Sequence, residues 1–129
     1  MIFLPVTTKE EVNKTKLLLE SYEEMKMMIA GFSNIEFSEA QLSLYNQYVA
    51  QIQMIDLAVD CIGDDELKEI IQHRYMNGNR YTDTLNKFTK SMDERTVNRR
   101  ITKGIEAIAR RLKFLDSSQK KEGTNDNTA

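Results

Sequence analysis

The chain has 129 residues, a formal net charge of −2, and one residue each of Cys and His. A single Cys cannot form an intramolecular disulfide, and so few Cys and His residues exclude most metal-ligand and nucleophilic sets. We therefore expect no metal, no cofactor and no enzymatic activity. No apolar run approaches the roughly 20 residues that span a bilayer, and the first residues lack the basic and apolar regions of an export signal. We expect a cytoplasmic protein with no membrane association.

Helix breakers are scarce, with one Pro and five Gly, and apolar residues never alternate cleanly with polar ones over a strand length. This pattern predicts an all-α fold. Two capping boxes predict helix starts: Thr8 with Glu11, and Ser38 with Gln41. They open expected helices over residues 9–30 and 39–62. These helices would form an N-terminal helical hairpin over residues 1–62 that serves packing, oligomerisation or partner contact.

The apolar residues of the hairpin allow two interpretations each. The second helix has a heptad-like seam that Asp56 interrupts, formed by Leu42, Tyr45, Val49, Ile52 and Val59. The seam indicates a homodimer through the N-terminal helices as one arrangement. Met25, Met27 and Met28 form an apolar patch that is either simple core or a docking surface for another subunit or a polymerase, because Met adapts to irregular partners.

Residues 63–116 are expected to form a helix-turn-helix unit of three helices. The expected helices cover residues 66–76, 81–88 and 94–115. Asp64 or Asp65 can cap the first helix, and Asp93 can cap the third after the polar turn TKSM. Residues 117–129 contain no apolar residue before the terminal Ala, so burial cannot offset the entropy of ordering them. We expect a flexible tail there.

Charge is divided unevenly along the chain. Residues 1–72 carry 5 Lys or Arg against 13 Asp or Glu, whereas residues 73–115 carry 11 against 4. Attraction to phosphate depends on local charge rather than on the charge of the whole chain. The basic block beside an acidic one therefore favours a polyanion-binding module attached to another unit.

The last expected helix reads DERTVNRRITKGIEAIARRLKFL and is amphipathic. Its apolar stripe consists of Val97, Ile101, Ile105, Ile108 and Leu112. Arg95, Arg99 and Lys103 form a column one turn apart on the opposite face. An ordinary solvated face is the simpler interpretation of this column. The preceding short helix and turn favour instead a helix-turn-helix, in which the first residues of the second helix enter the major groove of DNA.

The helix-turn-helix interpretation assigns two sets of DNA contacts. Arg recognises guanine and Asn recognises adenine, so base reading is assigned near the helix start, to Arg95, Thr96, Asn98 and Arg99. Phosphate contact is assigned to the cations around them, which are Arg74, Arg80, Lys87, Lys90, Arg100, Lys103 and Arg110. For each of these cations, solubility alone is the alternative role.

A longer stretch resembles a known family and reads HRYMNGNRYTDTLNKFTKSMDERTVNRRITKGIEAIARRL. It resembles region 4 of sigma-70-type factors, and most closely the small Gram-positive phage late-transcription regulators of the ArpU family, with RinA-type activators nearby. The recognisable elements are Arg74-Tyr75, Tyr81, Arg95-Thr96-Val97, Arg99-Arg100 and Lys103. Two positions depart from the pattern, because the turn TKSMD lacks the usual Gly and Thr84 replaces an aliphatic residue. The resemblance implies a sigma-region-4-like arrangement of the three-helix unit.

The resemblance also implies a function. It implies a phage or prophage regulator that binds double-stranded DNA sequence-specifically and activates late genes in the bacterial cytoplasm, at the nucleoid, with contact to host RNA polymerase as one means of activation. The residues by themselves support duplex DNA binding through a basic helix. The alternative is a transcription-interfering protein-interaction module that docks on RNA polymerase or another regulator without reading DNA itself. The acidic N-terminal half and the irregular turn favour this alternative.

Overall fold

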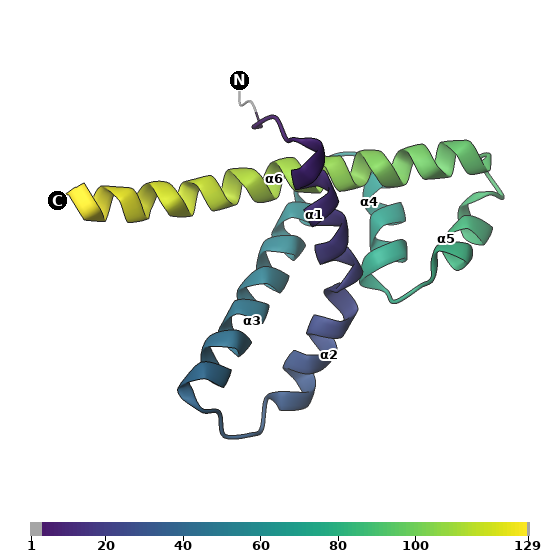
Figure 1. Ribbon diagram of the computed structural model, residues 1–129. Helices are drawn as coiled ribbons and strands as arrows, with labels where there is room; N and C mark the ends of the chain where they lie inside the picture. The colour runs from purple at the N-terminus through teal and green to yellow at the C-terminus, as the bar shows by residue number, and fades with distance from the viewer. Residues whose placement is uncertain (1–3, 129) are drawn as a thin grey trace.

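The computed structural model describes the backbone of residues 4–128 and the side chains of residues 4–116. All regular secondary structure in this part of the chain is helical. In chain order the helices are α1 (Lys9–Glu20), α2 (Tyr22–Phe32), α3 (Glu39–Asp60), α4 (Asp65–Ile71), the π-helical η1 (Gln72–Met76), α5 (Tyr81–Phe88) and α6 (Glu94–Thr128). No strand occurs among the described residues, so the predicted all-α fold is confirmed. Figure 1 shows α6 as a long rod that α1 crosses, with the α2–α3 hairpin projecting away from it.

Side-chain caps begin α1 and α3 where the sequence predicts them. The Glu11 amide donates to Thr8 Oγ1 at 3.1 Å, and the Thr8 amide donates to Glu11 Oε1 at 2.8 Å. Ser38 and Gln41 make the same reciprocal pair at 3.2 and 2.9 Å. Each box supplies partners to amides that have no acceptor within the helix. Both predicted capping boxes are confirmed.

The prediction of one helix over residues 9–30 is wrong, because the chain bends at Ser21 between α1 and α2. The Ser21 backbone has φ −91° and ψ −4°, and its hydroxyl donates to the Leu17 carbonyl at 3.0 Å. A serine hydroxyl that bonds to the carbonyl four residues earlier competes with the helical hydrogen bonds and bends a helix. The apolar spacing continues through the bend, so periodicity alone predicts a single helix.

The predicted hairpin is present, and α2 and α3 lie side by side in opposite directions (Figure 1). In the half nearer α6, Ile55 and Val59 are fully buried, and the Tyr22 hydroxyl of α2 donates to Asp56 Oδ1 at 2.6 Å. This hydrogen bond explains the carboxylate that interrupts the apolar seam. Leu42, at the other end of the predicted seam, is 47% exposed. The seam is therefore part of the core over one half of α3 and part of the surface over the other.

The helix that the sequence predicts over residues 66–76 begins slightly earlier and widens in its last turn. The predicted cap is confirmed, since Asp64 Oδ1 accepts from the amide three residues later at 3.1 Å. In η1 the Asn77 amide donates to the Gln72 carbonyl, five residues earlier, at 3.0 Å. Gly78 has a φ of +72°, a left-handed conformation that suits glycine and ends the segment.

One hydrophobic core joins the hairpin to the C-terminal helices. Its fully buried side chains include Tyr22 of α2, Ile55 of α3, Ile71 of α4 and Ile108 of α6. At Gly104 the backbone of α6 comes so close to α4 that an added Cβ would lie 2.4 Å from Cγ1 of Ile71. The expected N-terminal and C-terminal units thus pack as layers of a single core rather than as separate bodies.

The helix predicted to end at Leu115 is longer, because α6 continues to Thr128. Its backbone includes residues 117–128, for which the sequence predicts a flexible tail. No Pro interrupts this stretch, and its Gln, Lys and Glu residues favour helix. The side chains of residues 117–129 lie outside the described part, so flexibility there stays a prediction. Within the described part, none of the helices combines the length and apolar character needed to cross a membrane.

Candidate nucleic-acid interface

Asp93 sets the start of α6, as the sequence predicts. Its Oδ1 accepts from the Thr96 amide at 2.8 Å. Hydrogen bonds from Thr96 and the nearby charge of Arg99 hold the pKa of Asp93 below its ordinary value. The ionised carboxylate also suits the positive end of the helix dipole. The first turns of α6 are therefore anchored in a defined conformation.

The apolar face of α6 is buried, and this fixes the rotation of the helix about its axis. Val97, Ile101, Ile105 and Ile108 are all buried, whereas Leu112 is partly exposed. The predicted apolar stripe is confirmed. Because α6 packs on α1, α3, α4 and α5, only the face opposite its apolar stripe points to solvent.

The predicted cationic column occupies that solvent face. Arg95, Arg99 and Lys103 are exposed, and each lies one turn from the next. Among the side chains of residues 4–116, none of these three cations forms a salt bridge. Arg99 attracts the Asp93 carboxylate from beyond salt-bridge distance. A cation that is not held in a close ion pair can bind a phosphate or a base edge without first breaking one. The column is thus available to an anionic ligand.

The other two predicted base-reading residues have side chains that are already engaged. Thr96 is half-buried and takes part in the cap at Asp93. Asn98 is exposed, but its Oδ1 accepts a hydrogen bond from the Tyr81 hydroxyl of α5. Recognition of adenine by Asn needs both the amide oxygen and the amide nitrogen. The bond from Tyr81 uses one of the two lone pairs of Oδ1, so it orients the Asn98 amide while leaving a second acceptor position for adenine.

Three predicted phosphate ligands form weak ion pairs or none: Arg80, Lys87 and Lys90. Arg80 pairs with Asp83 at 3.7 Å, and Lys87 pairs with Glu69 at 3.8 Å. Lys90 is exposed and forms no salt bridge among the described side chains. Exposed ion pairs contribute little stability, so these cations can turn toward a phosphate at small cost.

Two further predicted phosphate ligands have partners within the fold. Arg100 pairs with Glu66 at 3.1 Å and with Asp64 at 3.6 Å, which ties α6 to the start of α4. Arg110 donates from Nε and Nη2 to the backbone carbonyls of residues 5 and 4, at 3.1 and 3.2 Å. Lys113 adds a bond to the carbonyl of residue 6 at 2.9 Å. Arg110 and Lys113 thereby hold residues 4–6, which precede α1, against α6. To reach DNA, Arg100 and Arg110 would have to break the bonds described here.

A groove of about 510 Å³ lies beside α6 where α1, η1 and α5 meet it. The polar side chains that line the groove include Asn13, Lys16, Glu20, Arg74, Tyr81, Asn98 and Thr102. The guanidinium group of Arg74, the last of the predicted phosphate ligands, stacks 4.6 Å above the Tyr75 ring. The groove therefore brings two cations, Lys16 and Arg74, to the flank of the cationic column.

Lys16 lines the groove, although the sequence analysis assigns it no DNA contact. It is exposed and lies on α1, far from α6 in sequence, within a half of the chain where acidic residues predominate. Averaging charge over residues 1–72 hides a single lysine. Only the packing of α1 on α6 places it at the groove, so no local pattern could have identified it.

A buried polar residue of α5 has a polar partner. Thr84 of α5 is fully buried, and its hydroxyl lies 2.8 Å from Nδ1 of His73 in η1. The imidazole meets the edge of the Phe88 ring with centroids 5.7 Å apart. Burial, together with the charge of Lys87, lowers the pKa of His73. A buried hydroxyl with a partner is tolerated, so Thr84 helps to anchor α5 to η1.

The turn TKSMD between α5 and α6 is held by local hydrogen bonds. The amides of Ser91 and Met92 both donate to the Phe88 carbonyl at 3.2 Å. Met92 is partly buried and packs against the core. The turn therefore leads from the end of α5 to the cap at Asp93 as an ordered segment.

The described residues contain no group of three or more His, Cys, Asp and Glu side chains arranged to hold a metal ion. Comparison of the chain with models of known protein families gave no match, and comparisons with curated proteins and with solved structures gave none either.

Proposed function

We propose that this chain is a sequence-specific DNA-binding transcription regulator that places the N-terminal half of α6 in the major groove. The proposal depends on one observation: Arg95, Arg99 and Lys103 form an exposed column without ion pairs, on a helix whose opposite face is buried. A short helix and a turn precede α6, which is the order of a helix-turn-helix. The major groove, about 12 Å wide, admits an α-helix.

Each side chain has a distinct role in this proposal. Arg95 and Arg99, nearest the start of α6, fork to the O6 and N7 atoms of guanine. Lys103, a turn further along, meets phosphate. Lys16 and Arg74, which line the protein groove beside α6, contact phosphates of the DNA backbone. The phosphate contacts set affinity and position, whereas the arginines set the preferred sequence.

Binding to DNA at several salt concentrations tests the proposal. Selection from a random duplex library gives the preferred sequence, and fluorescence anisotropy then gives Kd on that sequence and on random DNA. Each phosphate contact is expected to steepen the fall of log affinity with log salt by about 0.9. The proposal fails if no sequence is enriched or if affinity does not depend on salt.

The resemblance to ArpU-type regulators extends the proposal to the biological role. On that basis the target lies upstream of phage or prophage late genes, binding activates them, and the protein acts in the bacterial cytoplasm at the nucleoid. Footprinting gives the position of the site relative to the promoter, and its half-site symmetry reports whether a homodimer binds. Transcription in vitro with host RNA polymerase gives the sign of regulation. Activation would be refuted if the footprint overlaps the promoter and addition of the protein lowers transcription.

A second candidate function is a protein-interaction module that docks on RNA polymerase or another regulator and interferes with transcription without reading DNA. Exposed apolar side chains at the hairpin tip favour it, among them Met27, which is 70% exposed. Co-purification with RNA polymerase, together with the absence of DNA binding, would select this function over the first.

A further inference from the structure

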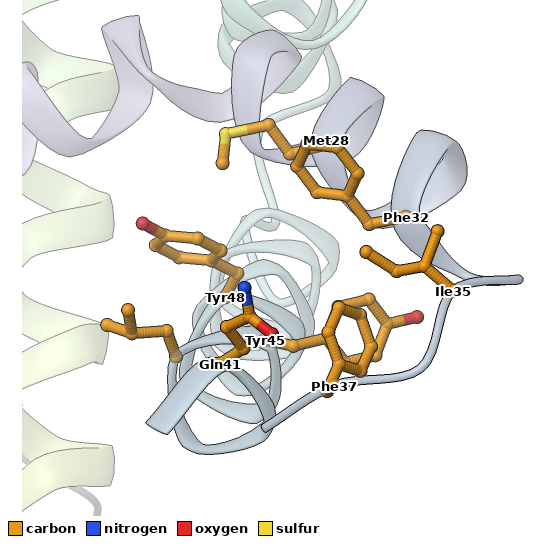
Figure 2. Close-up of a pocket in the computed structure, with 8 residues that line it drawn as sticks. Met28, Phe32, Ile35, Phe37, Gln41, Tyr45 and Tyr48 are labelled. Carbon is orange, nitrogen blue, oxygen red and sulfur yellow. The ribbon is translucent and has the colours of Figure 1, made fainter. Parts of the chain in front are cut away.

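An apolar pocket of about 270 Å³ opens at the tip of the α2–α3 hairpin. Figure 2 shows the side chains that surround it, which come from the end of α2, the connecting loop and the start of α3. They include Met28, Phe32, Ile35, Phe37, Tyr45 and Tyr48. The rings of Phe37 and Tyr45 lie with centroids 5.0 Å apart at an angle of 33°. The pocket is thus an aromatic-walled hollow that is not part of the buried core.

Several large apolar side chains around the pocket are exposed to solvent. Phe32 is 44%, Ile35 50% and Leu44 51% exposed. Contiguous exposed apolar surface marks an interaction site more often than a solvated one. The volume falls below the roughly 300–1,000 Å³ of small-molecule sites. It therefore suits one or two side chains of a protein better than a whole ligand.

The charge around the pocket indicates which kind of protein fits it. No Lys, Arg or His occurs between Lys26 and Lys68, whereas Glu36 and Glu39 are exposed in the tip segment. The faces of aromatic rings also attract cations. An acidic segment or a nucleic acid would be repelled here, and a segment with Lys or Arg beside an apolar anchor would be attracted.

The backbone around the pocket indicates the form of the occupant. Apart from the groups at their ends, α2 and α3 satisfy their amides and carbonyls within the helices, so these helices offer no strand edge for pairing. A hollow between two helices instead receives the side chains of a third helix. We propose that the tip pocket binds a basic amphipathic helix of a partner protein. One bulky apolar side chain of that helix enters between Phe32 and Tyr45, and its Lys or Arg residues face Glu36 and Glu39.

This site is separate from the proposed DNA interface. In Figure 1 the tip lies at the far end of the hairpin from α6, which carries the cationic column. A partner seated on the tip leaves Arg95 and Arg99 uncovered. The inference therefore does not depend on DNA binding, and its test uses no DNA.

A designed peptide probes the pocket. The probe is a labelled peptide of about 14 residues with leucine at helical spacing and lysine elsewhere. One control peptide has the same composition with the leucines scattered, and another has glutamate in place of lysine. With the full-length protein, the periodic lysine peptide is expected to bind at least about tenfold more tightly than either control by fluorescence anisotropy. Equal affinity for the periodic and scattered peptides, or for the glutamate peptide, would overturn the proposal.

Two leucines of α3 give a matched pair of variants. Leu44 lines the pocket and is 51% exposed, whereas Leu57 lies outside it and is 49% exposed. Leu44→Asp and Leu57→Asp add the same charge at similar exposure. The charge at residue 44 lies nearer the bound peptide and can only strengthen its electrostatic attraction, so weaker binding of Leu44→Asp reports the lost apolar contact. Leu44→Asp is expected to weaken binding about tenfold, and Leu57→Asp to leave it within about twofold. Tyr45→Ala, which changes no charge, is expected to weaken binding as well.

Circular dichroism of each variant confirms that the helices are retained. Equal loss of binding in the two aspartate variants, or none in either, would refute a pocket-specific contact. Sedimentation of the wild-type protein covers one further occupant. If the protein self-associates and only Leu44→Asp abolishes this, the pocket belongs to a second copy of the chain and the proposal of a different partner is wrong.

Discussion

The close contact between α4 and α6 predicts that Gly104→Ala destabilises the fold, although alanine has the better helix propensity. An added Cβ would lie 2.4 Å from Cγ1 and 2.6 Å from Cδ1 of Ile71, well inside the 3.4–4 Å of ordinary contact. Ile71 is fully buried, so its side chain has no solvent to move into. Overpacking of this kind costs about 1–3 kcal/mol, and the better helix propensity of Ala returns about 1 kcal/mol. We expect Gly104→Ala to lower the free energy of unfolding by up to about 2 kcal/mol.

A double-mutant cycle isolates this contact. Ile71→Ala removes both obstructing atoms, so in that background Gly104→Ala is expected to raise the free energy of unfolding by about 1 kcal/mol. The resulting coupling energy is about 1–3 kcal/mol. Urea denaturation followed by circular dichroism measures all four proteins. Ile71→Ala alone costs about 2–5 kcal/mol, and Ile71→Val, which removes only Cδ1, gives a milder cycle of the same sign. If Gly104→Ala has the same effect in every background, the two helices are not in close contact.

Three further predictions concern the DNA interface and the core. Arg99→Ala is expected to weaken binding to the selected DNA by about 1–3 kcal/mol with little effect on random DNA, whereas Lys103→Ala weakens both alike and lowers the salt dependence; equal losses on both kinds of DNA for both variants would contradict the division of roles. Tyr22→Phe is expected to lower the free energy of unfolding in urea by about 1–3 kcal/mol, because the hydroxyl donates to the Asp56 carboxyl group; an unchanged unfolding midpoint would argue against this bond. Because burial lowers the pKa of His73 in the folded state, its neutral form contributes stability above its unfolded pKa of about 6.5 that is lost as the pH falls through the folded pKa. His73→Gln should flatten the fall in unfolding free energy below about pH 6.5, and an identical pH profile would refute this.

Local chemistry accounts for the features of the fold that the sequence predicts. The capping boxes at Thr8 and Ser38 act within a few residues, and so does the cap at Asp93. The apolar stripe of α6 follows from helical periodicity, which needs no knowledge of the partner helices. From the cap and the stripe together, the exposure of Arg95 and Arg99 follows without the tertiary structure.

The features that the sequence does not predict depend on tertiary packing or on competing hydrogen bonds. The helix is interrupted at Ser21, whose hydroxyl bonds to the Leu17 carbonyl, and apolar periodicity gives no sign of such a side-chain bond. Arg110 resembles a phosphate ligand in sequence, but it bonds to carbonyls more than a hundred residues earlier. Lys16 reaches the groove only because α1 packs on α6. Contacts of such large sequence separation leave no local pattern.

The charge division along the sequence becomes a spatial division in the fold. The cationic column lies on the N-terminal half of α6, whereas the hairpin tip that carries Glu36 and Glu39 lies at the far end of α2 and α3 (Figure 1). Acidic residues that approach α6 include Asp64 and Glu66 at the start of α4, which pair with Arg100, and Glu11 of α1, which pairs with Lys113, and each pairing offsets their charge. Exposed charges are screened beyond about 8 Å at physiological ionic strength, so DNA at the column is attracted locally and is not repelled by the distant tip. The net negative charge of the chain is therefore compatible with the proposed DNA interface, and the tip stays open to a basic partner when DNA is bound.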